Sequence, residues 1–231
     1  MLNYQAYFSM VDENEHFIVI NKEAGINFHS EDGEFGVVVA AEKFLNKKLY
    51  SVHRLDKMTS GLLLLAKSSA VANELSSLFK AQTIQKFYLA ISDKKPKKKQ
   101  GLIKGGMQKS RRSMWKLTSN KENLAITQFF SYPLLEGKRL FIVKPKTGKT
   151  HQIRVALKSL SSAICGDHLY AETPANYDRG YLHAYQIIFT LFGQEYDFSC
   201  LPKTGELFHN KEFIVLLKNL YDLNQLAWPK V

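Results

Sequence analysis

Short apolar runs alternate along the chain with segments of helical periodicity. Apolar runs bounded by polar or glycine-containing stretches are typical of strands, whereas apolar residues three and four positions apart indicate helices. We therefore predict strands over residues 17–20, 61–66, 86–91, 125–132, 139–144, 186–192 and 195–200. The same reasoning predicts helices over residues 37–45, 68–81, 150–160 and 213–226. Ser68 or Ser69 is the expected N-cap of the second helix.

The order of these elements indicates the fold class. A short glycine-containing stretch over residues 134–138 separates two predicted strands, as the loop of a hairpin would. A turn-like stretch over residues 21–25 follows the first strand. Hairpins mixed with scattered helices favour an α+β fold over a parallel sheet of βαβ units.

Length and composition indicate a folded protein of ordinary type. The chain has 231 residues, of which 45% are hydrophobic, 23% charged and 12% aromatic, which argues against disorder of the whole chain. Two cysteines are too few for a disulfide framework or a four-cysteine zinc site, and the seven histidines form no His-x-x-x-His pair. The first ten residues lack a signal-peptide pattern, and no apolar run reaches the ~18 residues of a membrane helix. We therefore expect a cytoplasmic protein with no membrane partner and no metal.

Positive charge is concentrated in one part of the chain. Lys and Arg total 32 against 21 Asp and Glu, a net charge of +11. Residues 94–121 contain eleven basic residues and no acidic one, with Lys97, Lys98 and Lys99 in their densest run. Like charge this concentrated favours a polyanionic partner, nucleic acid first, and we expect these lysines to contact phosphates. A solvated lysine-rich loop without a partner is the plainer alternative.

The same basic segment suggests how the chain is organised. Gly101, Gly105 and Gly106 argue against a rigid helix there, so we predict an exposed, mobile excursion over residues 94–121. It would join two halves, residues 1–93 and 122–231, of a single domain that spans residues 1–231.

Polar residues cluster just before the predicted buried strand at 61–66. Residues 53–61 read His-Arg-Leu-Asp-Lys-Met-Thr-Ser-Gly. Polar groups beside a core strand must be hydrogen-bonded or ion-paired, or must serve a function. A loop held by a rigid strand is a common place for a catalytic group. Asp56 could be a nucleophile, a general base, a metal ligand or an ion-paired structural carboxylate, and the residues alone leave these roles open.

Residues 53–67, HRLDKMTSGLLLLAK, closely resemble the signature of the RluA-type RNA pseudouridine synthases. Weaker matches follow the family's order at residues 21–25, 86–90, 147–155, 166–170 and 182–184. The resemblance covers about residues 10–200. It implies an α+β pseudouridine synthase fold, with a bent, mixed, mostly antiparallel sheet from two halves, flanking helices and a central active-site cleft. The pattern begins by about residue 10, so we expect no preceding S4 RNA-binding domain.

The resemblance also implies a reaction, the isomerisation of uridine to pseudouridine in structured tRNA or rRNA, without a cofactor. Asp56 matches the family's essential aspartate, either a nucleophile or a base. Tyr88 matches the tyrosine that stacks on the target base, and Arg154 matches the arginine that pairs with the aspartate. An arginine suits this pairing because its fork binds a carboxylate at two points and stays charged.

Four further residues would bind the substrate or support its site. Arg54 matches an arginine that fills the space left by the flipped uridine. Leu182 would pack on the uracil. Lys149 replaces an arginine and can still bind phosphate, though not in a bidentate manner. We interpret His53 as a structural hydrogen-bonding residue near the substrate.

The alternative function is an RNA-binding protein or RNA chaperone that keeps the fold without turnover. The set Asp56, Tyr88 and Arg154 favours the enzyme, because a pure binder does not need a buried carboxylate–guanidinium pair. We expect a monomer, since nothing in the sequence requires a second subunit.

Overall fold

The computed structural model describes residues 4–31, 34–135 and 137–231. The chain forms two compact units. Residues 1–85 and 183–203 make the first unit, and residues 86–182 and 204–231 make the second. This division differs from the expected halves, because the chain returns after residue 183 to pair with strands of the first unit.

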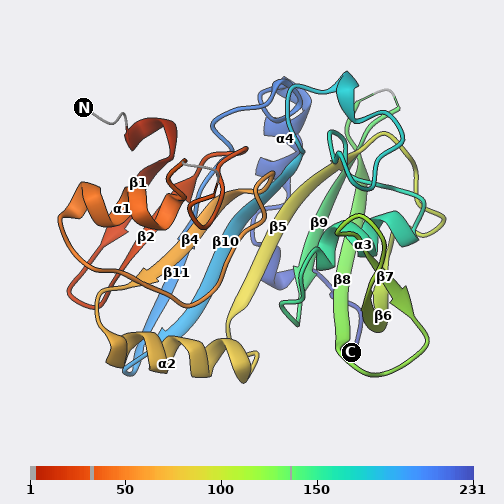
Figure 1. The fold of residues 1–231 in the computed structure, drawn as a ribbon. Coiled ribbons are helices and arrows are strands. Elements are labelled where there is room, and N and C mark those ends of the chain that lie inside the picture. The colour runs from red at the N-terminus through yellow and green to blue at the C-terminus, as the bar shows by residue number, and fades with distance from the viewer. Residues whose placement is uncertain (1–3, 32–33, 136) are drawn as a thin grey trace. The chain divides into compact units, whose positions relative to one another are not determined.

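The first unit is a mixed sheet with two helices (Figure 1). Its elements are β1 (Phe8–Glu13), β2 (Phe17–Lys22), α1 (Val37–Leu45), β3 (Tyr50–Ser51), β4 (Ser60–Ala66), α2 (Ser69–Lys80), β10 (Leu182–Leu191) and β11 (Gln194–Ser199). Strands β1, β2 and β4 pair antiparallel, and β3 also pairs antiparallel with β4. β10 runs parallel to β4 and forms an antiparallel hairpin with β11.

The core of the first unit follows from its apolar runs. Every residue of β4 and β2 is buried, as continuous Leu and Ile-Val runs require. α2 begins after Ser68, whose hydroxyl accepts a hydrogen bond from the Val71 N–H at 3.3 Å, and it packs Val71 and Leu75 into the core. The predicted strands at 17–20 and 61–66 and the predicted helices at 37–45 and 68–81 are confirmed.

A close backbone approach joins β4 to β10. Gly61 pairs with Ala184 and has a φ of +109°, which L side chains rarely adopt. A Cβ at Gly61 would lie 2.3 Å from the Ala184 carbonyl oxygen. Only glycine allows the two strands to pair at this point.

The second unit is an antiparallel sheet in the order β5-β9-β8-β6-β7. Its elements are β5 (Gln85–Ser92), β6 (Gln100–Lys109), β7 (Trp115–Thr118), β8 (Leu124–Pro133), β9 (Arg139–Pro145), α3 (Gln152–Ser159) and α4 (Lys211–Asn219). The predicted strands and hairpin around residue 135 are confirmed, as is a helix within residues 150–160. The two units together confirm the α+β class.

The segment predicted as a mobile excursion, residues 94–121, contains two paired strands. The segment forms β6 and β7, and β6 pairs with β8 as well as with β7. Gly106 serves close packing rather than flexibility, since a Cβ there would lie 2.1 Å from the Asn120 carbonyl oxygen. β6 buries Ile103 and Met107 on the core side, which anchors the strand. The lysine run 97–99, in the loop before β6, is exposed as expected.

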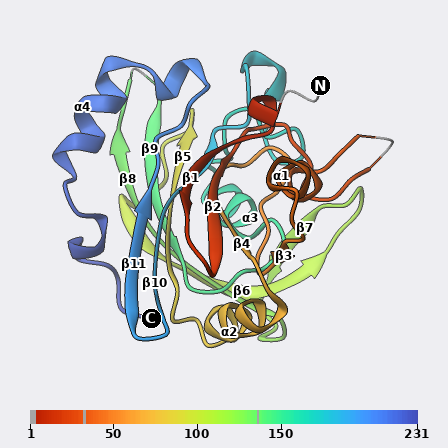
Figure 2. The ribbon, with the colours of Figure 1, turned by 90° about the vertical axis from the view of Figure 1, so that its left-hand side faces the viewer.

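The C-terminal helix is shorter than predicted. α4, dark blue in Figure 2, ends at Asn219 rather than continuing to residue 226. Tyr221 takes a positive φ of 45°, and the Asp222 side chain then caps a separate 3-10 turn by accepting the Asn224 N–H at 2.8 Å. Local capping therefore breaks the apolar periodicity. Across the described ranges, no helix has the length and apolar character to cross a membrane.

Candidate active site

Asp56 lies in the loop between β3 and β4, on a turn held by its own backbone. The Asp56 carbonyl accepts a hydrogen bond from the Thr59 N–H at 3.0 Å. Thr59 is buried, whereas Asp56 is half-buried at the start of the turn. The buried strand β4 begins directly after the turn, so a rigid element fixes one end of the loop.

A buried lysine binds the backbone beside the Asp56 turn. The Lys22 side chain is fully buried, and its Nζ donates to the carbonyls of Ile26 at 2.7 Å, Glu23 at 2.8 Å and Lys57 at 3.3 Å. The Gly25 N–H donates to the same Lys57 carbonyl at 2.8 Å. The turn after β2 and the residue next to Asp56 are thus joined through one ammonium group.

His53 lies at the start of the same loop and contacts two neighbouring elements. Its Nε2 accepts a hydrogen bond from the Leu64 N–H at 2.9 Å, and its ring stacks on Phe79 with centroids 4.7 Å apart. This contact joins the start of the loop to β4 and α2. The neighbouring Arg54 is exposed, with its guanidinium 5.9 Å from the centroid of the Phe28 ring.

Arg154 forms a buried bidentate ion pair in the second unit. Its Nε and Nη2 donate to Asp167 Oδ2 at 2.7 Å and Oδ1 at 2.8 Å. Arg154 is 5% exposed and Asp167 is 0% exposed. The partner of Arg154 within its own unit is therefore Asp167, which sequence reasoning did not select. The expected pairing of Arg154 with Asp56 concerns the two different units and stays a prediction.

Tyr170 holds Arg154 from a second side. The Arg154 guanidinium lies 5.0 Å from the centroid of the Tyr170 ring. The Tyr170 hydroxyl accepts the Trp115 N–H of β7 at 2.8 Å and lies 3.0 Å from His151 Nδ1. His151 precedes α3 in a left-handed conformation, with φ 55°. His151 and Arg154 therefore both contact Tyr170.

The other predicted residues lie on strands and loops. Tyr88 is half-buried on β5, in register with Val143 of β9. Leu182 is buried at the start of β10, and its carbonyl accepts a hydrogen bond from Arg179 at 3.3 Å. The half-buried Lys149 donates its backbone N–H to Gln152 Oε1 at 2.9 Å, which fixes the loop before α3.

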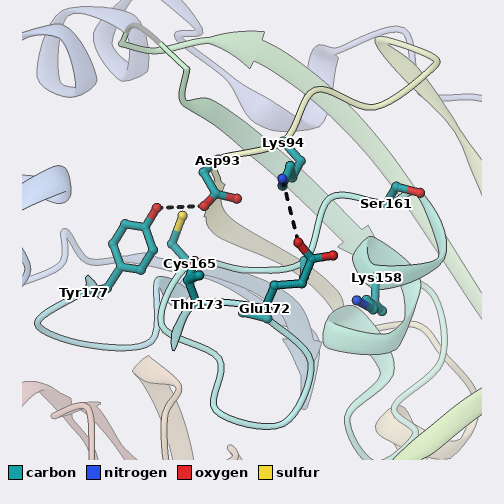
Figure 3. Close-up of a pocket in the computed structure, with 10 residues that line it drawn as sticks. Asp93, Lys94, Lys158, Ser161, Cys165, Glu172, Thr173 and Tyr177 are labelled. Carbon is teal, nitrogen blue, oxygen red and sulfur yellow. Dashed lines mark hydrogen bonds and ion pairs between the residues drawn. The ribbon is translucent and has the colours of Figure 1, made fainter. Parts of the chain in front are cut away.

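A cavity of about 200 Å³ opens beside the loop that leads to Asp167 (Figure 3). The Tyr177 hydroxyl donates to Asp93 at 2.9 Å, and Lys94 pairs with Glu172 at 3.8 Å across the lining. Burial raises the pKa of the Cys165 thiol to about 11, so this cysteine is protonated and unreactive near neutral pH.

Sequence reasoning missed Lys22, Asp167, Tyr170 and His183 as site or support residues. His183 is fully buried, with its two ring nitrogens 2.8 Å from the Ser60 hydroxyl and 2.8 Å from the Cys200 carbonyl. All four residues lie inside the weaker motif matches, which is the signal that could have found them. In the part of the chain that the structure describes, no three His, Cys, Asp or Glu side chains form a group that could hold a metal.

Comparisons with known proteins agree with this architecture. Two human structures share the fold, RNA Pseudouridylate Synthase Domain Containing 1 and Domain Containing 4. The first has a TM-score of 0.73 at 21% identity, covering 84% of this chain and 83% of that one. The second has a TM-score of 0.69 at 24% identity, covering 92% of each chain. The fold is therefore the pseudouridine synthase fold, a mixed, mostly antiparallel α+β arrangement.

Sequence comparisons then identify the family. The model of the RNA pseudouridylate synthase family matches residues 16–159. An uncharacterized RNA pseudouridine synthase of Haemophilus influenzae is 50% identical over 198 residues, covering 85% of this chain and 88% of that protein. Ribosomal large subunit pseudouridine synthase C of Rickettsia bellii is 38% identical over 200 residues, covering 80% of this chain and 65% of that protein. The chain belongs to the RNA pseudouridylate synthase family and is an isomerase that acts on RNA.

Proposed function

We propose that this enzyme converts uridine to pseudouridine in the RNA of the large ribosomal subunit. The similarity to ribosomal large subunit pseudouridine synthase C of Rickettsia bellii carries this choice of RNA. This chain spans 65% of the length of that relative, so the choice concerns the catalytic part that the two chains share.

In the proposed reaction, the Asp56 carboxylate acts on the flipped-out nucleotide. It either attacks the substrate or takes a ribose proton, and in both cases the bond between C1′ and N1 breaks. The uracil then turns, C5 bonds to C1′, C5 loses its proton and N1 gains one. An Asp56 that has attacked the nucleotide is released in this step, and an Asp56 that has taken the ribose proton returns it. Atoms and charge balance without an oxidant, reductant or co-reactant. Each role requires an ionised carboxylate, and the turn fixed by Lys22 supports its placement.

Three further residues act on the nucleotide in this proposal. Arg154 stabilises the Asp56 carboxylate, because a guanidinium stays charged throughout the physiological pH range. The Tyr88 ring stacks on the flipped uracil, an interaction worth about 1–3 kcal/mol per base. Leu182 packs on the uracil, while Arg54 fills the gap that the base leaves in the RNA. The exposure of Arg54 is consistent with that role.

The RNA backbone is bound by basic side chains in this proposal. The lysine run 97–99 is exposed in the loop before β6, and residues 94–121 contain no acidic residue. Lys149, half-buried before α3, adds a point charge that suits a single phosphate. Such contacts supply affinity and orientation, while the choice of uridine depends on RNA shape and unstacked bases.

The experiment uses unmodified RNA labelled with tritium at C5 of uridine, because pseudouridine formation releases that tritium. Large-subunit rRNA, small-subunit rRNA and tRNA are tested separately. We expect release from large-subunit rRNA alone, and release from tRNA alone would contradict the proposed target. Binding without release from any fraction would favour the RNA-binding alternative.

Two variants test the role of Asp56 in the same assay. Asp56→Ala is expected to abolish release. Asp197→Ala is the matched control, since Asp197 is an exposed aspartate of the same unit whose carboxylate accepts a hydrogen bond from Gln186 at 2.8 Å. We expect the control to retain full activity.

A further inference from the structure

The Arg154–Asp167 pair is buried more deeply than most ion pairs. Removing a guanidinium and a carboxylate from water is costly, and apolar residues often stabilise a fold as well as such a pair does. Stability alone therefore does not account for the pair. The geometry of the pair points to a positioning role instead. Two parallel hydrogen bonds fix both the position of the Arg154 guanidinium and its rotation in its own plane.

Asp167 is itself held rigidly. Its Oδ1 accepts backbone hydrogen bonds from Leu169 at 3.0 Å and Tyr170 at 3.3 Å. Gly166, just before it, has a φ of +73°, and a Cβ there would lie 1.9 Å from the Arg179 carbonyl oxygen. The loop therefore has one path, and the carboxylate is fixed before it binds Arg154.

The Tyr170 ring fixes the remaining freedom of the guanidinium. The ring lies 5.0 Å from Arg154, a distance at which a cation is attracted to an aromatic face. Because its hydroxyl binds the Trp115 N–H and His151, the ring is tied to β7 and to the start of α3. Trp115 is in register with Lys109 at the basic end of the β6–β7 hairpin.

We propose that Asp167 and Tyr170 are positioning residues for Arg154 in the isomerisation reaction. Asp167 binds the Nε and Nη2 edge and so fixes the orientation of the guanidinium, whose charge stabilises the Asp56 carboxylate in the proposed function. Tyr170 fixes the plane of the guanidinium and links Arg154 to the strand beside the basic hairpin end. This inference rests on the proposed function, in which Arg154 stabilises the Asp56 carboxylate.

The first test compares Asp167→Asn and Tyr170→Phe with wild type on the RNA that supports tritium release. Asp167→Asn keeps the Oδ1 acceptor and the size of the side chain but removes the charge. We expect its kcat to fall by about 100-fold, the effect of misplacing a group by ~1 Å, with an unchanged KM for RNA. Tyr170→Phe keeps the ring and loses the hydroxyl ties, so we expect a smaller decrease in kcat.

Matched controls use the hydrogen-bonded pair beside the cavity in the same unit. Tyr177→Phe removes a tyrosine hydroxyl that donates to Asp93, and Asp93→Asn removes the charge of its acceptor. Both variants are expected to keep wild-type kcat. A loss of kcat in these controls equal to that of Asp167→Asn would overturn the proposal, because the effect would then be a general response to lost hydrogen bonds.

A double-variant comparison separates positioning from a merely structural role. If Asp167 acts through Arg154, then Asp167→Asn combined with Arg154→Lys is no slower than Arg154→Lys alone. Losses of kcat that multiply would overturn the proposal. Full activity of Arg154→Lys would instead contradict the proposed role of Arg154 itself, so the two failures are distinguishable.

Circular dichroism melting of each variant shows whether it folds. If Asp167→Asn does not fold, Tyr170→Phe is used as the test, since its aromatic ring can still contact Arg154. Wild-type kcat in a folded Tyr170→Phe would then overturn the proposal, and a reduced kcat that disappears in the Arg154→Lys background would support it.

Discussion

Replacing Lys22 by methionine tests how the Asp56 turn is held. The substitution keeps an unbranched side chain of similar length and removes the ammonium group. Three main-chain carbonyls then lose the hydrogen bond from the ammonium group, including that of Lys57 next to Asp56. The Gly25 N–H still binds the Lys57 carbonyl, so the turn loosens rather than opens.

The expected magnitude follows from the geometry of these bonds. Two are short, at 2.7 and 2.8 Å, and the third is longer, at 3.3 Å. A hydrogen bond to a charged group contributes about 1.5–3 kcal/mol net, so the two short bonds total roughly 3–6 kcal/mol. Methionine avoids the desolvation of a buried ammonium, which offsets part of this loss. We expect the free energy of unfolding to fall by about 2–4 kcal/mol.

The assay combines urea unfolding with kinetics on RNA. Because the Lys57 carbonyl adjoins Asp56, we expect kcat of Lys22→Met to fall by about 100-fold in the fraction that remains folded. Lys48→Met is the control, since the exposed Lys48 pairs with Glu42 at 3.0 Å in the same unit. The control should lose at most about 1 kcal/mol and keep its kcat. Unchanged stability of Lys22→Met would refute the reasoning.

Three further predictions concern other parts of the chain. Gly61→Ala should lower the unfolding free energy by more than Gly193→Ala does. Both glycines have a positive φ, but only at Gly61 would a Cβ clash with the Ala184 backbone. Equal losses of unfolding free energy in urea would contradict this clash. Burial lowers the pKa of Lys144 to about 8, so between pH 8 and 10.5 the unfolded chain binds more protons than the folded chain. The free energy of unfolding of wild type should therefore rise with pH in this range relative to that of Lys144→Met, and parallel profiles of the two proteins against pH would contradict this prediction. Replacing the lysine run 97–99 by alanine should weaken RNA binding and lower the slope of log K against log salt by about 2–3, whereas an unchanged slope would exclude phosphate contacts.

Local pattern predicted most of the secondary structure. The Leu run of β4 and the Ile-Val run of β2 are typical of buried strands, and the bounds of α1 match the predicted 37–45. The predictions differed from the structure where contacts between residues distant in sequence determine the local conformation. The glycines of β6 resemble those of a flexible loop, yet Gly106 is required by contact with the Asn120 backbone. Only pairing with β7 and β8 makes that segment rigid.

The candidate site was likewise predicted where neighbours in sequence determine it and missed where tertiary contacts do. The motif around Asp56 predicted the loop before β4 and the structural role of His53, because both follow from neighbours in sequence. The partner of Arg154 did not follow from spacing. Asp167 reaches the guanidinium through a turn at Gly166 that only a positive φ permits, and Lys22 reaches the Lys57 carbonyl across 35 positions. Such contacts depend on tertiary structure, which residue periodicity does not encode.

Tritium release by purified wild-type protein and by Asp56→Ala, on C5-labelled RNA from cells that lack this protein, tests the central claim most directly. We predict stoichiometric release by wild type and none by Asp56→Ala, with equal RNA binding by both proteins. Equal release by the two proteins would contradict the role of Asp56 and the account of the site built around it.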